Sequence, residues 1–379
     1  MPEPLKNLFN DGVIRGMAQH FARHDPSFDA AGFVSFALLD LELLELKQRS
    51  DRIMEAMERF LPDDFACSGN ILIASLRPDD DGDMAGIGID ETGIAGWAIM
   101  PMADYVAWRG QEHFDLAMRC FYEMTRRFSA EFGIRPFLIS QPAKTLAVLQ
   151  GWLTDPSRHV RRLISEGTRP RLPWGMQIPG FVADPAPILP LLEALRDDTE
   201  EYVRRSVANN LNDIAKNHPD LVAGIAQDWL QDAGTDRHRL VRHACRTLIK
   251  QGHPGVMQAF GFGAVNITLQ QFEVITPVIR MGESVDFCVE FVLNEPDTRN
   301  VVLDYVMHHR KANGTTSPKV FKWKTIRLEP GQKTILSRRH VIRAITTRRY
   351  HPGIHTIELL INGRKYGSAC FDLVPGQAA

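Results

Sequence analysis

The sequence has few cysteines and no long apolar run, and each absence excludes a class of protein. Its 379 residues include five cysteines, which are scattered and never spaced as Cys-x-x-Cys. A disulfide framework and a zinc site are therefore not expected, and a reducing compartment fits. No stretch of about eighteen apolar residues occurs, so no membrane span is expected. The first residues, MPEPLKNLFNDG, lack the apolar core of a secretion signal, which predicts a cytoplasmic protein.

Motifs for metals and cofactors are also missing. An acid-rich frame begins at Asp79, but Met84 and Asp90 stand where a calcium-binding loop needs Gly and Glu. The Gly-Ile-Gly at 86–88 lacks the third glycine and the preceding strand of a dinucleotide-binding motif. The segment 77–96 is therefore expected to be a surface loop, and neither a metal nor a cofactor is expected.

Charge is distributed unevenly, although the net charge is only −2. Residues 1–130 carry 12 basic and 22 acidic side chains, residues 131–267 carry 16 and 14, and residues 268–379 carry 16 and 10. A polyanion responds to the local field and not to the total, so nucleic acid stays a possible partner. The alternative is a solvated acidic surface and a basic third that arose by chance.

The length suits two to three domains, and the first third has helical periodicity. Apolar residues recur at helical spacing over Phe33–Phe60 and again over Tyr105–Phe132. The intervening residues 61–104 break this pattern and are expected to be irregular.

A repeated motif in the middle third predicts a helical solenoid. An aspartate is followed after four residues by Val and two basic residues, at Asp155–Arg162, Asp198–Arg205 and Asp236–His243. Repeats of about 40 residues built from paired helices are typical of HEAT and armadillo proteins. The aspartate suits a helix N-terminus. The alternative is three ordinary helices that share aspartate caps.

From Thr268 onward, short alternating runs are separated by turn-like segments. Strands at about ten-residue spacing indicate a β-sandwich, most simply an immunoglobulin-like one. The Gly-rich segment 253–265 would be the linker. The fold class expected is therefore mostly α, with a HEAT-like helical-repeat domain over 1–265 and an immunoglobulin-like β-sandwich over 268–379.

Helical spacing groups polar side chains on two of the repeat helices. One group is Arg158, Arg162 and Glu166, and the other is Arg205, Asn209 and Asp213. If the two helices lie side by side, these groups form a polar strip with arginines at one end and acids at the other. The alternative is routine surface pairs, each worth a few tenths of a kcal/mol.

Three further features favour a DNA-binding surface. The segment 158–171 has five arginines but a single acid, Glu166, a composition suited to phosphates. Trp174 follows two prolines, where it either stacks on a base or sugar or serves as a buried anchor. Asn, a poor helix former, is abundant over 206–213. The arginines are Arg158, Arg161, Arg162, Arg169 and Arg171.

The C-terminal third interleaves basic and aromatic residues, as nucleic-acid grooves do. The alternative is a strand edge protected by lysines, and the pattern favours neither. The residues are Lys319, Phe321, Lys322, Trp323, Lys324, Arg338, Arg339, His340, Arg348, Arg349, Tyr350 and His351.

Three segments carry a specific resemblance to a known family. They are SAEFGIRPFL (129–138), WLTDPSRHVRRLISEGTRPRLPWG (152–175) and DDTEEYVRRSVANNLNDIAKNHPD (197–220). Across residues 105–265 the chain resembles the AlkC-type DNA alkylation-repair glycosylases of the HEAT-like repeat superfamily. One branch of that type carries a C-terminal immunoglobulin-like domain, which fits 268–375 by position.

The resemblance implies hydrolysis of the N-glycosidic bond of cationic alkylated bases, such as 3-methyladenine and 3-methylcytosine, in double-stranded DNA. It also implies that the base is not flipped in the conventional way. Carried over by motif, Glu166 and Asp213 are the catalytic acids and Trp174 is the aromatic. Arg162 and Arg169 foremost would hold phosphates. The full set expected at DNA is Arg158, Arg161, Arg162, Arg169, Arg171, Arg205, Asn209, Asn210, Lys322 and Arg339.

The residue chemistry agrees with this expectation. A base that is already cationic leaves without a general acid, so carboxylates need only stabilise the developing oxocarbenium ion and position water. Glu131 is a second-tier candidate, with a brace to Arg135 as its alternative role. A monomer suffices for such a reaction. Two other functions remain open, a non-catalytic DNA-binding scaffold or damage sensor and a protein-binding scaffold, because a fold does not fix a function.

Overall fold

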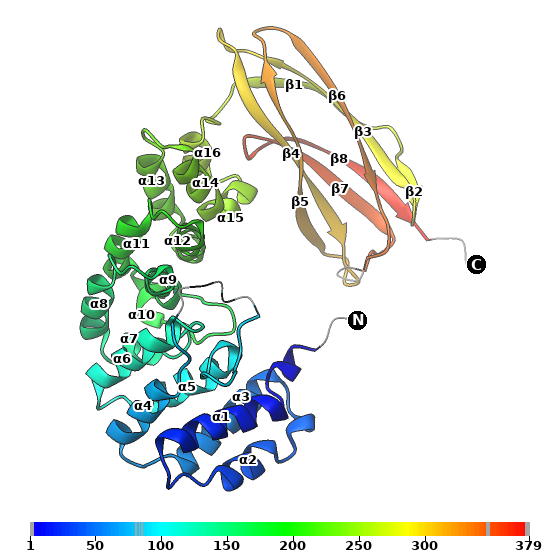
Figure 1. Ribbon diagram of the computed structural model, residues 1–379. Helices are drawn as coiled ribbons and strands as arrows, with labels where there is room; N and C mark the ends of the chain where they lie inside the picture. Colours follow the sequence, from blue (N-terminus) through cyan, green and yellow to red (C-terminus); the bar gives the residue numbers. More distant parts are fainter. Residues whose placement is uncertain (1–3, 80–81, 83, 85, 346–348, 376–379) are drawn as a thin grey trace. The chain divides into compact units, whose positions relative to one another are not determined.

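The structure is a computed structural model that describes residues 4–79, 82, 84, 86–345 and 349–375. It divides into two compact units, Met1–Asn217 and His218–Ala379 (Figure 1). The first unit is helical, and the second contains helices followed by strands. The boundary expected near residue 266 falls inside the second unit, where the first strand begins at Ile267.

The first unit contains the helices from α1 to α12. They are α1 (Asp11–His24), α2 (Ala30–Leu38), α3 (Leu46–Phe60), α4 (Phe65–Ala74), α5 (Ile99–Arg109), α6 (Phe114–Thr125), α7 (Arg135–Ser140), α8 (Pro142–Gly151), α9 (Arg158–Gly167), α10 (Pro179–Ala183), α11 (Leu189–Leu195) and α12 (Glu201–Ile214). Within the described ranges, no helix combines the length and the apolarity needed to cross a membrane.

Two expectations for the first third differ from the structure. The helix expected over 33–60 is interrupted, because Asp40 adopts a left-handed backbone between α2 and α3. The region 61–104 contains α4, whose sequence FACSGNILIA is almost uniformly apolar or small. A helix buried on most sides lacks the polar face that makes helical periodicity visible. The segment 77–95 is non-helical where described, and a short 3-10 helix, Gly96–Ala98, follows it.

The repeated aspartate and arginine build the start of a helix. Asp155 Oδ1 accepts a hydrogen bond from the backbone N of Ser157 (2.8 Å), just before α9. Arg161 then donates from Nη1 back to the carbonyls of Asp155 (2.7 Å) and Pro156 (3.0 Å).

The second copy repeats this arrangement before α12. Asp198 Oδ1 accepts from the backbone N of Glu200 (2.9 Å), and Arg204 donates to the carbonyls of Asp198 (2.6 Å) and Thr199 (2.9 Å). In the third copy, Asp236 already lies inside the first turn of α14. The first two copies are therefore structurally equivalent, and their arginines close a turn.

Helices α9 and α12 pack closely, since small polar residues lie at their contact. Ser165 Oγ donates to Ser206 Oγ (2.6 Å), and Asn210 Nδ2 donates to the carbonyl of Ser165 (2.8 Å) and to Thr168 Oγ1 (3.0 Å). Satisfied polar groups of this kind fix one relative position of two helices. The acids Glu166 and Asp213 are thereby brought toward each other.

The second unit begins with short helices and continues as two sheets. The helices are α13 (Pro219–Trp229), α14 (Thr235–Ala244), α15 (Arg246–Gln251) and α16 (Pro254–Ala259). The strands are β1 (Ile267–Val274), β2 (Val278–Arg280), β3 (Ser284–Leu293), β4 (Arg299–Arg310), β5 (Thr316–Leu328), β6 (Lys333–Val341), β7 (Gly353–Ile361) and β8 (Arg364–Val374).

The strands form one sheet in the order β1-β3-β6 and another in the order β2-β8-β7-β4-β5. Alternate side chains of β3 and β4, among them Phe291 and Leu303, are fully buried between the sheets. The expected alternating strands are confirmed, and β5 is an edge strand.

Two glycines bring the last helices of this unit against the sandwich. Gly252 ends α15 and Gly363 forms the β7–β8 turn, and both have φ near +70 (70 and 77). A Cβ on Gly363 would lie 2.3 Å from the Cα of Gly252. Asn362 Nδ2 also donates to the carbonyl of Gly263 (2.8 Å). The turn of the hairpin is therefore part of the junction.

We predict that Gly363→Ala destabilises the second unit more than Gly314→Ala does. Gly314 has φ +80, and a Cβ added there would meet no atom within 4 Å, so both changes share the backbone cost of about 1–2 kcal/mol. Only Gly363→Ala adds overpacking of roughly 1–3 kcal/mol. Thermal unfolding of the two variants measures the difference. Equal losses of stability in the two variants would show that the close approach of Gly252 and Gly363 does not contribute to the stability of the second unit.

Candidate functional site

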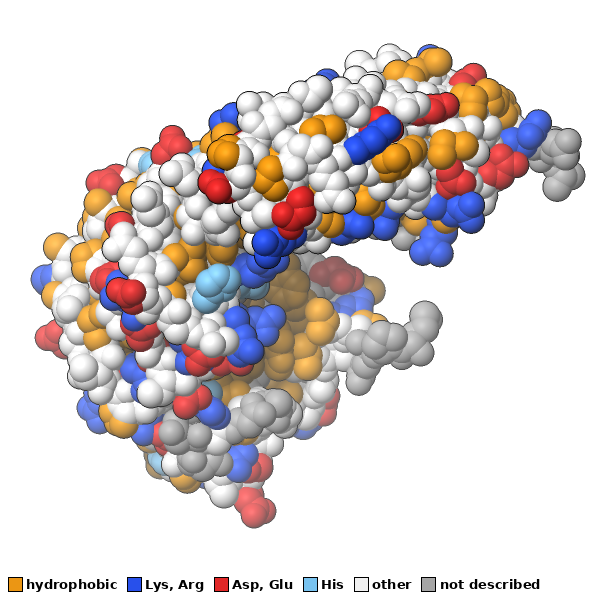
Figure 2. Space-filling model, turned by 90° about the horizontal axis from the view of Figure 1, so that it is seen from above, with side chains coloured by type: hydrophobic (Ala, Val, Ile, Leu, Met, Phe, Trp, Pro, Cys, Tyr) orange, Lys and Arg blue, Asp and Glu red, His pale blue; other side chains and the backbone are white. Residues whose placement is uncertain are grey.

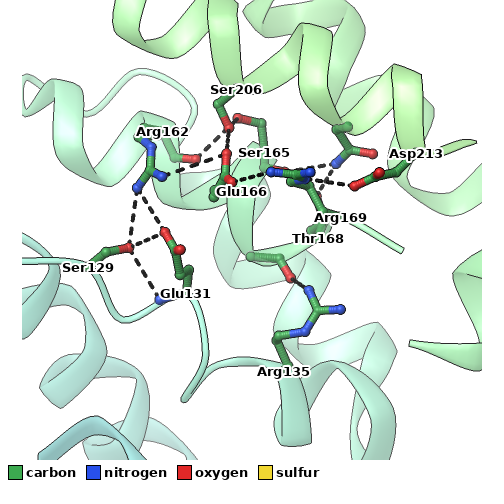
Figure 3. Close-up of polar contacts among 12 residues, drawn as sticks. Ser129, Glu131, Arg135, Arg162, Ser165, Glu166, Thr168, Arg169, Ser206 and Asp213 are labelled. Atoms are coloured by element: carbon green, nitrogen blue, oxygen red, sulfur yellow. Dashed lines mark hydrogen bonds and ion pairs between the residues drawn. The ribbon is translucent and has the colours of Figure 1, made fainter. Parts of the chain in front are cut away.

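The centre of the candidate site is a guanidinium held between two carboxylates (Figure 3). Arg169 donates from Nε to Asp213 Oδ2 (2.8 Å) and from Nη1 to Glu166 Oε1 (2.6 Å). Glu166 lies near the end of α9 and Asp213 near the end of α12. Glu166 is 5%, Asp213 2% and Arg169 7% exposed. The cluster is therefore buried and depends on all three charges.

Other groups satisfy the remaining carboxylate oxygens. Ser206 Oγ donates to Glu166 Oε2 (2.6 Å), and Lys216 Nζ donates to Asp213 Oδ1 (2.7 Å). Burial raises the pKa of the Glu166 carboxyl, but the charges of Arg162 and Arg169 outweigh burial, so this pKa lies below its ordinary value. Glu166 is thus an anion at neutral pH.

Glu131 supplies a third carboxylate. Arg162 Nη1 donates to Glu131 Oε2 (2.9 Å) and to Ser129 Oγ (3.3 Å), and Ser129 Oγ donates to the same carboxylate (2.7 Å). The expected brace from Glu131 to Arg135 is not formed, because Glu131 lies before α7, so the two residues do not share a helix. Arg135 instead donates to backbone carbonyls. Glu131 therefore belongs to the same polar network as Glu166 (Figure 3).

A cavity of about 430 Å³ opens onto these groups. Its aromatic walls contain Trp97, Phe128, Phe132, Trp174 and Tyr202, and its charged lining consists of Glu131, Arg162, Glu166 and Arg169. Asp213 lies behind Arg169 and does not belong to the lining. An aromatic wall beside carboxylates is the environment that a flat cation prefers.

Trp174 lies on the rim of this cavity. Its side chain is 74% exposed, and its backbone has φ 63, a left-handed conformation that a tryptophan rarely adopts. The alternative of a buried anchor is wrong. An exposed indole held in an unfavourable backbone conformation is a feature of functional loops.

Sequence reasoning missed the other aromatic side chains. Tyr202 precedes Ser206 by four residues and therefore faces the same way on α12, a signal that could have been used. The guanidinium of Arg162 lies 5.0 Å from the centre of its ring. Trp97 and Phe128 come from segments far from the repeats, and no local pattern links them to the site.

Three residues expected at DNA are instead used inside the protein. Arg161 binds Asp198 through Nε (2.6 Å) and Nη2 (3.1 Å), in addition to the carbonyls before α9. Arg169 binds the two acids described above, and Asn210 is fully buried between α9 and α12. Their donors point to protein acceptors, so these positions differ from the expectation of free phosphate ligands.

Other expected DNA contacts lie nearer the surface. Arg205 is exposed and Asn209 half-buried on α12. Arg158 donates to the carbonyl of Gly82 (3.1 Å), and Arg171 donates to Asn217 Oδ1 (3.1 Å). The three arginines among them keep their charge at or near the surface of the first unit.

In the second unit, Lys322 lies on the edge strand β5 and pairs in register with Asp304. Lys322, Lys324 and Arg242 line a cavity of about 280 Å³ within this unit. Arg339, on β6, is exposed and binds Asp286 through two bonds (2.9 and 3.1 Å). Lys and Arg side chains gather along one border of the strand-rich part (Figure 2). The edge position suits both a protected strand and a phosphate-binding surface.

No metal centre is found in the part of the chain that the structure describes, where no group of three or more His, Cys, Asp or Glu side chains could hold an ion. Residues 80, 81, 83 and 85 of the acid-rich frame from Asp79 to Asp90 lie outside that part.

Comparisons with known proteins cover both units. Residues 268–375 match the family model described as the C-terminal Ig-like domain of the uncharacterised protein YhaZ. YhaZ of Bacillus subtilis (strain 168), described as uncharacterised, is 34% identical over 373 residues, which are 97% of this chain and 99% of YhaZ. The alkylpurine DNA glycosylase AlkC of Pseudomonas fluorescens, solved with DNA containing an abasic site analogue, is 34% identical. That match has a TM-score of 0.80 and covers 98% of this chain and 100% of AlkC.

The chain belongs to the AlkC family. Membership extends over the helical part and the strand-rich part, because the AlkC match covers nearly the whole chain. The helical-repeat region followed by an Ig-like domain is confirmed as the fold class. The cluster around Arg169 therefore lies in the part of the chain that AlkC shares.

We predict that Arg169→Gln lowers the free energy of unfolding by roughly 3–5 kcal/mol, because it removes the cation that two buried carboxylates share. Arg171→Gln is the control, since Arg171 binds the neutral side chains of Asn217 and Gln177. Urea unfolding at pH 7 measures both.

The pH dependence gives a second readout of the same variant. The lowered pKa of Glu166 stabilises the wild type above the ordinary pKa of a glutamate, and this contribution is lost as the pH falls through the lowered value. Protonation also removes the charge that loses its Arg169 partner in Arg169→Gln, so the difference in unfolding free energy between the two proteins narrows in acid. A difference in unfolding free energy that is small at pH 7, or that does not depend on pH, would contradict an ionic interaction of Arg169 with the two acids.

Proposed function

We propose that the chain is a monofunctional DNA glycosylase that hydrolyses the N-glycosidic bond of cationic alkylated bases in double-stranded DNA, 3-methyladenine and 3-methylcytosine among them. The observation that carries the proposal is the ionised Glu166 in an aromatic-walled cavity beside the exposed Trp174. The relationship to AlkC, whose structure contains DNA with an abasic site analogue, supports it. The protein would act as a cytoplasmic monomer without a cofactor.

The proposed reaction needs no general acid, but it does need anions near the sugar. An alkylated base that carries a positive charge takes the electron pair of the C1′–N bond and leaves as a neutral molecule. The deoxyribose becomes an oxocarbenium ion, and a water oxygen then bonds to C1′ while its proton passes to a base. A carboxylate stabilises the sugar cation through space and accepts that proton.

The residues divide this work. Glu166 lies in the cavity lining, where it would stabilise the sugar cation and accept the proton of water. Asp213 is bridged to Glu166 by Arg169, and its negative charge adds to the potential that a sugar cation would experience. Glu131, also in the lining, adds negative potential. Normal bases lack the positive charge, so the site selects lesions by electrostatics.

The composition of the cavity lining supports a monofunctional enzyme. In the described part of the chain, the lining of this cavity contains no lysine, and a lysine amine is what forms the Schiff base of strand-cleaving glycosylases. Trp174 stacks on a base or sugar from the rim. Bending the duplex, at a cost of order 1–6 kcal/mol, would present the lesion without extruding it.

The basic side chains on the surface of each unit bind phosphates. In the first unit these are Arg158, Arg171 and Arg205, with Arg162 at the cavity, and the neutral amide of Asn209 adds a hydrogen-bond donor. In the second unit, Lys322 and Arg339 are exposed and bind further phosphates. Binding of this kind weakens steeply with salt, since each phosphate contact releases counterions.

We predict that Glu166→Gln and Asp213→Asn each slow the release of 3-methyladenine by about 10²–10⁴-fold while DNA affinity is retained. Glu193→Gln, which changes an exposed acid paired with Arg196 on the surface, is the matched control and keeps the full rate. Base release from methylated DNA, followed by alkaline cleavage at abasic sites, measures the three. Full rates in both acid variants would overturn the assigned roles. A wild type that binds DNA but releases no base would indicate a non-catalytic scaffold.

We predict that Lys322→Gln and Arg339→Gln weaken DNA binding without changing the rate of base release at saturation. Each lost phosphate contact should reduce the slope of log K against log salt by about 0.9. Lys311→Gln, in the exposed turn between β4 and β5, controls for a general loss of charge. Slopes that match the control would assign the lysines of β5 to strand-edge protection alone.

A further inference from the structure

Arg135 is a buried arginine that the reaction scheme leaves without a role. It is the first residue of α7 and is 0% exposed. Its guanidinium donates from Nε to the carbonyl of Met176 (2.7 Å) and from Nη1 to the carbonyl of Gly167 (2.8 Å). Within the described residues, Nη2 has no hydrogen-bond partner. Burying a cation on neutral carbonyls is costly, so this arrangement needs a reason.

The two carbonyls lie at the two ends of one loop. Gly167 is the last residue of α9, and Met176 is the residue that follows Gly175 on the way to α10. Between them lie Arg169, which binds both acids, and Trp174, which forms the rim of the cavity. A single side chain therefore ties together both ends of the segment that carries these two residues. Figure 3 shows Arg135 reaching from α7 toward the turn after α9.

This loop needs external support. Two backbone bonds stabilise it from within, from Gly175 N to the Leu172 carbonyl (3.2 Å) and from Ile178 N to the Pro170 carbonyl (3.1 Å). Trp174 nevertheless keeps an unfavourable left-handed backbone while its indole is mostly in solvent. Such a conformation persists only where surrounding structure determines it. Asn210 donates to Thr168 Oγ1 (3.0 Å) and Arg171 to Asn217 Oδ1 (3.1 Å), and Arg135 adds a contact to each end of the segment from the buried side.

The charge of Arg135 is also retained at neutral pH. Burial, together with the neighbouring charge of Arg169, lowers its pKa to about 10, whereas the nearby acids Glu131, Asp213 and Glu166 act in the opposite direction. The guanidinium is thus a cation beneath the acidic cluster.

We propose that Arg135 is the positioning residue of the site, a buried clamp that holds the loop 168–175 so that Arg169 and Trp174 keep their places. The inference rests on the proposed function only for its activity readout, because the position of Trp174 can be followed without any reaction. A residue that merely stabilised the fold would affect the whole first unit equally.

The test compares Arg135→Lys with Arg49→Lys. Arg49 is a matched control in the same unit, a buried arginine on α3 that donates to the carbonyls of Leu44, Lys6 and Phe9. Each variant is also made with Trp174→Phe, so that the difference in acrylamide quenching of fluorescence isolates Trp174. The rate of single-turnover release of 3-methyladenine and the DNA dissociation constant are also measured for each variant.

We expect Arg135→Lys to slow single-turnover release by about tenfold to a hundredfold, as small misplacements of a catalytic group do, with little change in DNA affinity. The quenching of Trp174 should change in this variant and stay at the wild-type value in Arg49→Lys. Equal rates and equal Trp174 quenching in the two variants would overturn the proposal.

The experiment distinguishes failure of the proposed function from failure of the proposed clamp. If the wild type releases no base, the proposed function fails, and the quenching of Trp174 still decides the role of Arg135. If Arg135→Lys does not fold, Arg135→Gln replaces it, since its amide can still donate to one of the two carbonyls. Unchanged Trp174 quenching in the folded variant would then refute the clamp.

Discussion

The contact of Arg169 with Glu166 and Asp213 is the interaction on which the rest of the site depends. Two carboxylates buried side by side repel each other, and each costs several kcal/mol to remove from water. One planar guanidinium, with donors on different edges, satisfies both. The helix contact through Ser165 and Ser206 brings the acids within its reach. The site is thus a consequence of how α9 and α12 pack.

The acidic cluster also bears on the proposed reaction, which passes through a cationic intermediate. In the free protein Arg169 neutralises the acids, so the fold tolerates them. On the proposed function, a sugar that becomes positive during bond cleavage would be attracted by the same carboxylates. The arrangement keeps negative charge in a buried site, where the proposed sugar cation would form.

The sequence predicts the helix pair and its acids but not how the arginines are used. The spacing of Asp155 and Asp198 to their arginines marked equivalent helices, and the i, i+4 rule placed Glu166 and Asp213 on facing surfaces. Within 158–171 the arginines lacked acidic partners, but Asp198 and Asp213 lie 37 and 44 residues beyond Arg161 and Arg169. Pairs at that separation form only in the folded chain, as do the aromatic wall of Trp97 and Phe128 and the contact of Gly252 with Gly363. Alternating strands such as β3 were visible, because one face of each is buried.

The most direct measurement compares two DNA duplexes that differ only in the charge of one abasic-site analogue, a cationic pyrrolidine and a neutral tetrahydrofuran. If the carboxylates stabilise a sugar cation, the protein binds the pyrrolidine duplex more tightly than the tetrahydrofuran duplex. Replacing Glu166 and Asp213 by Gln and Asn then removes the preference. Equal affinity for the two duplexes, or a preference that survives without the acids, would contradict the account.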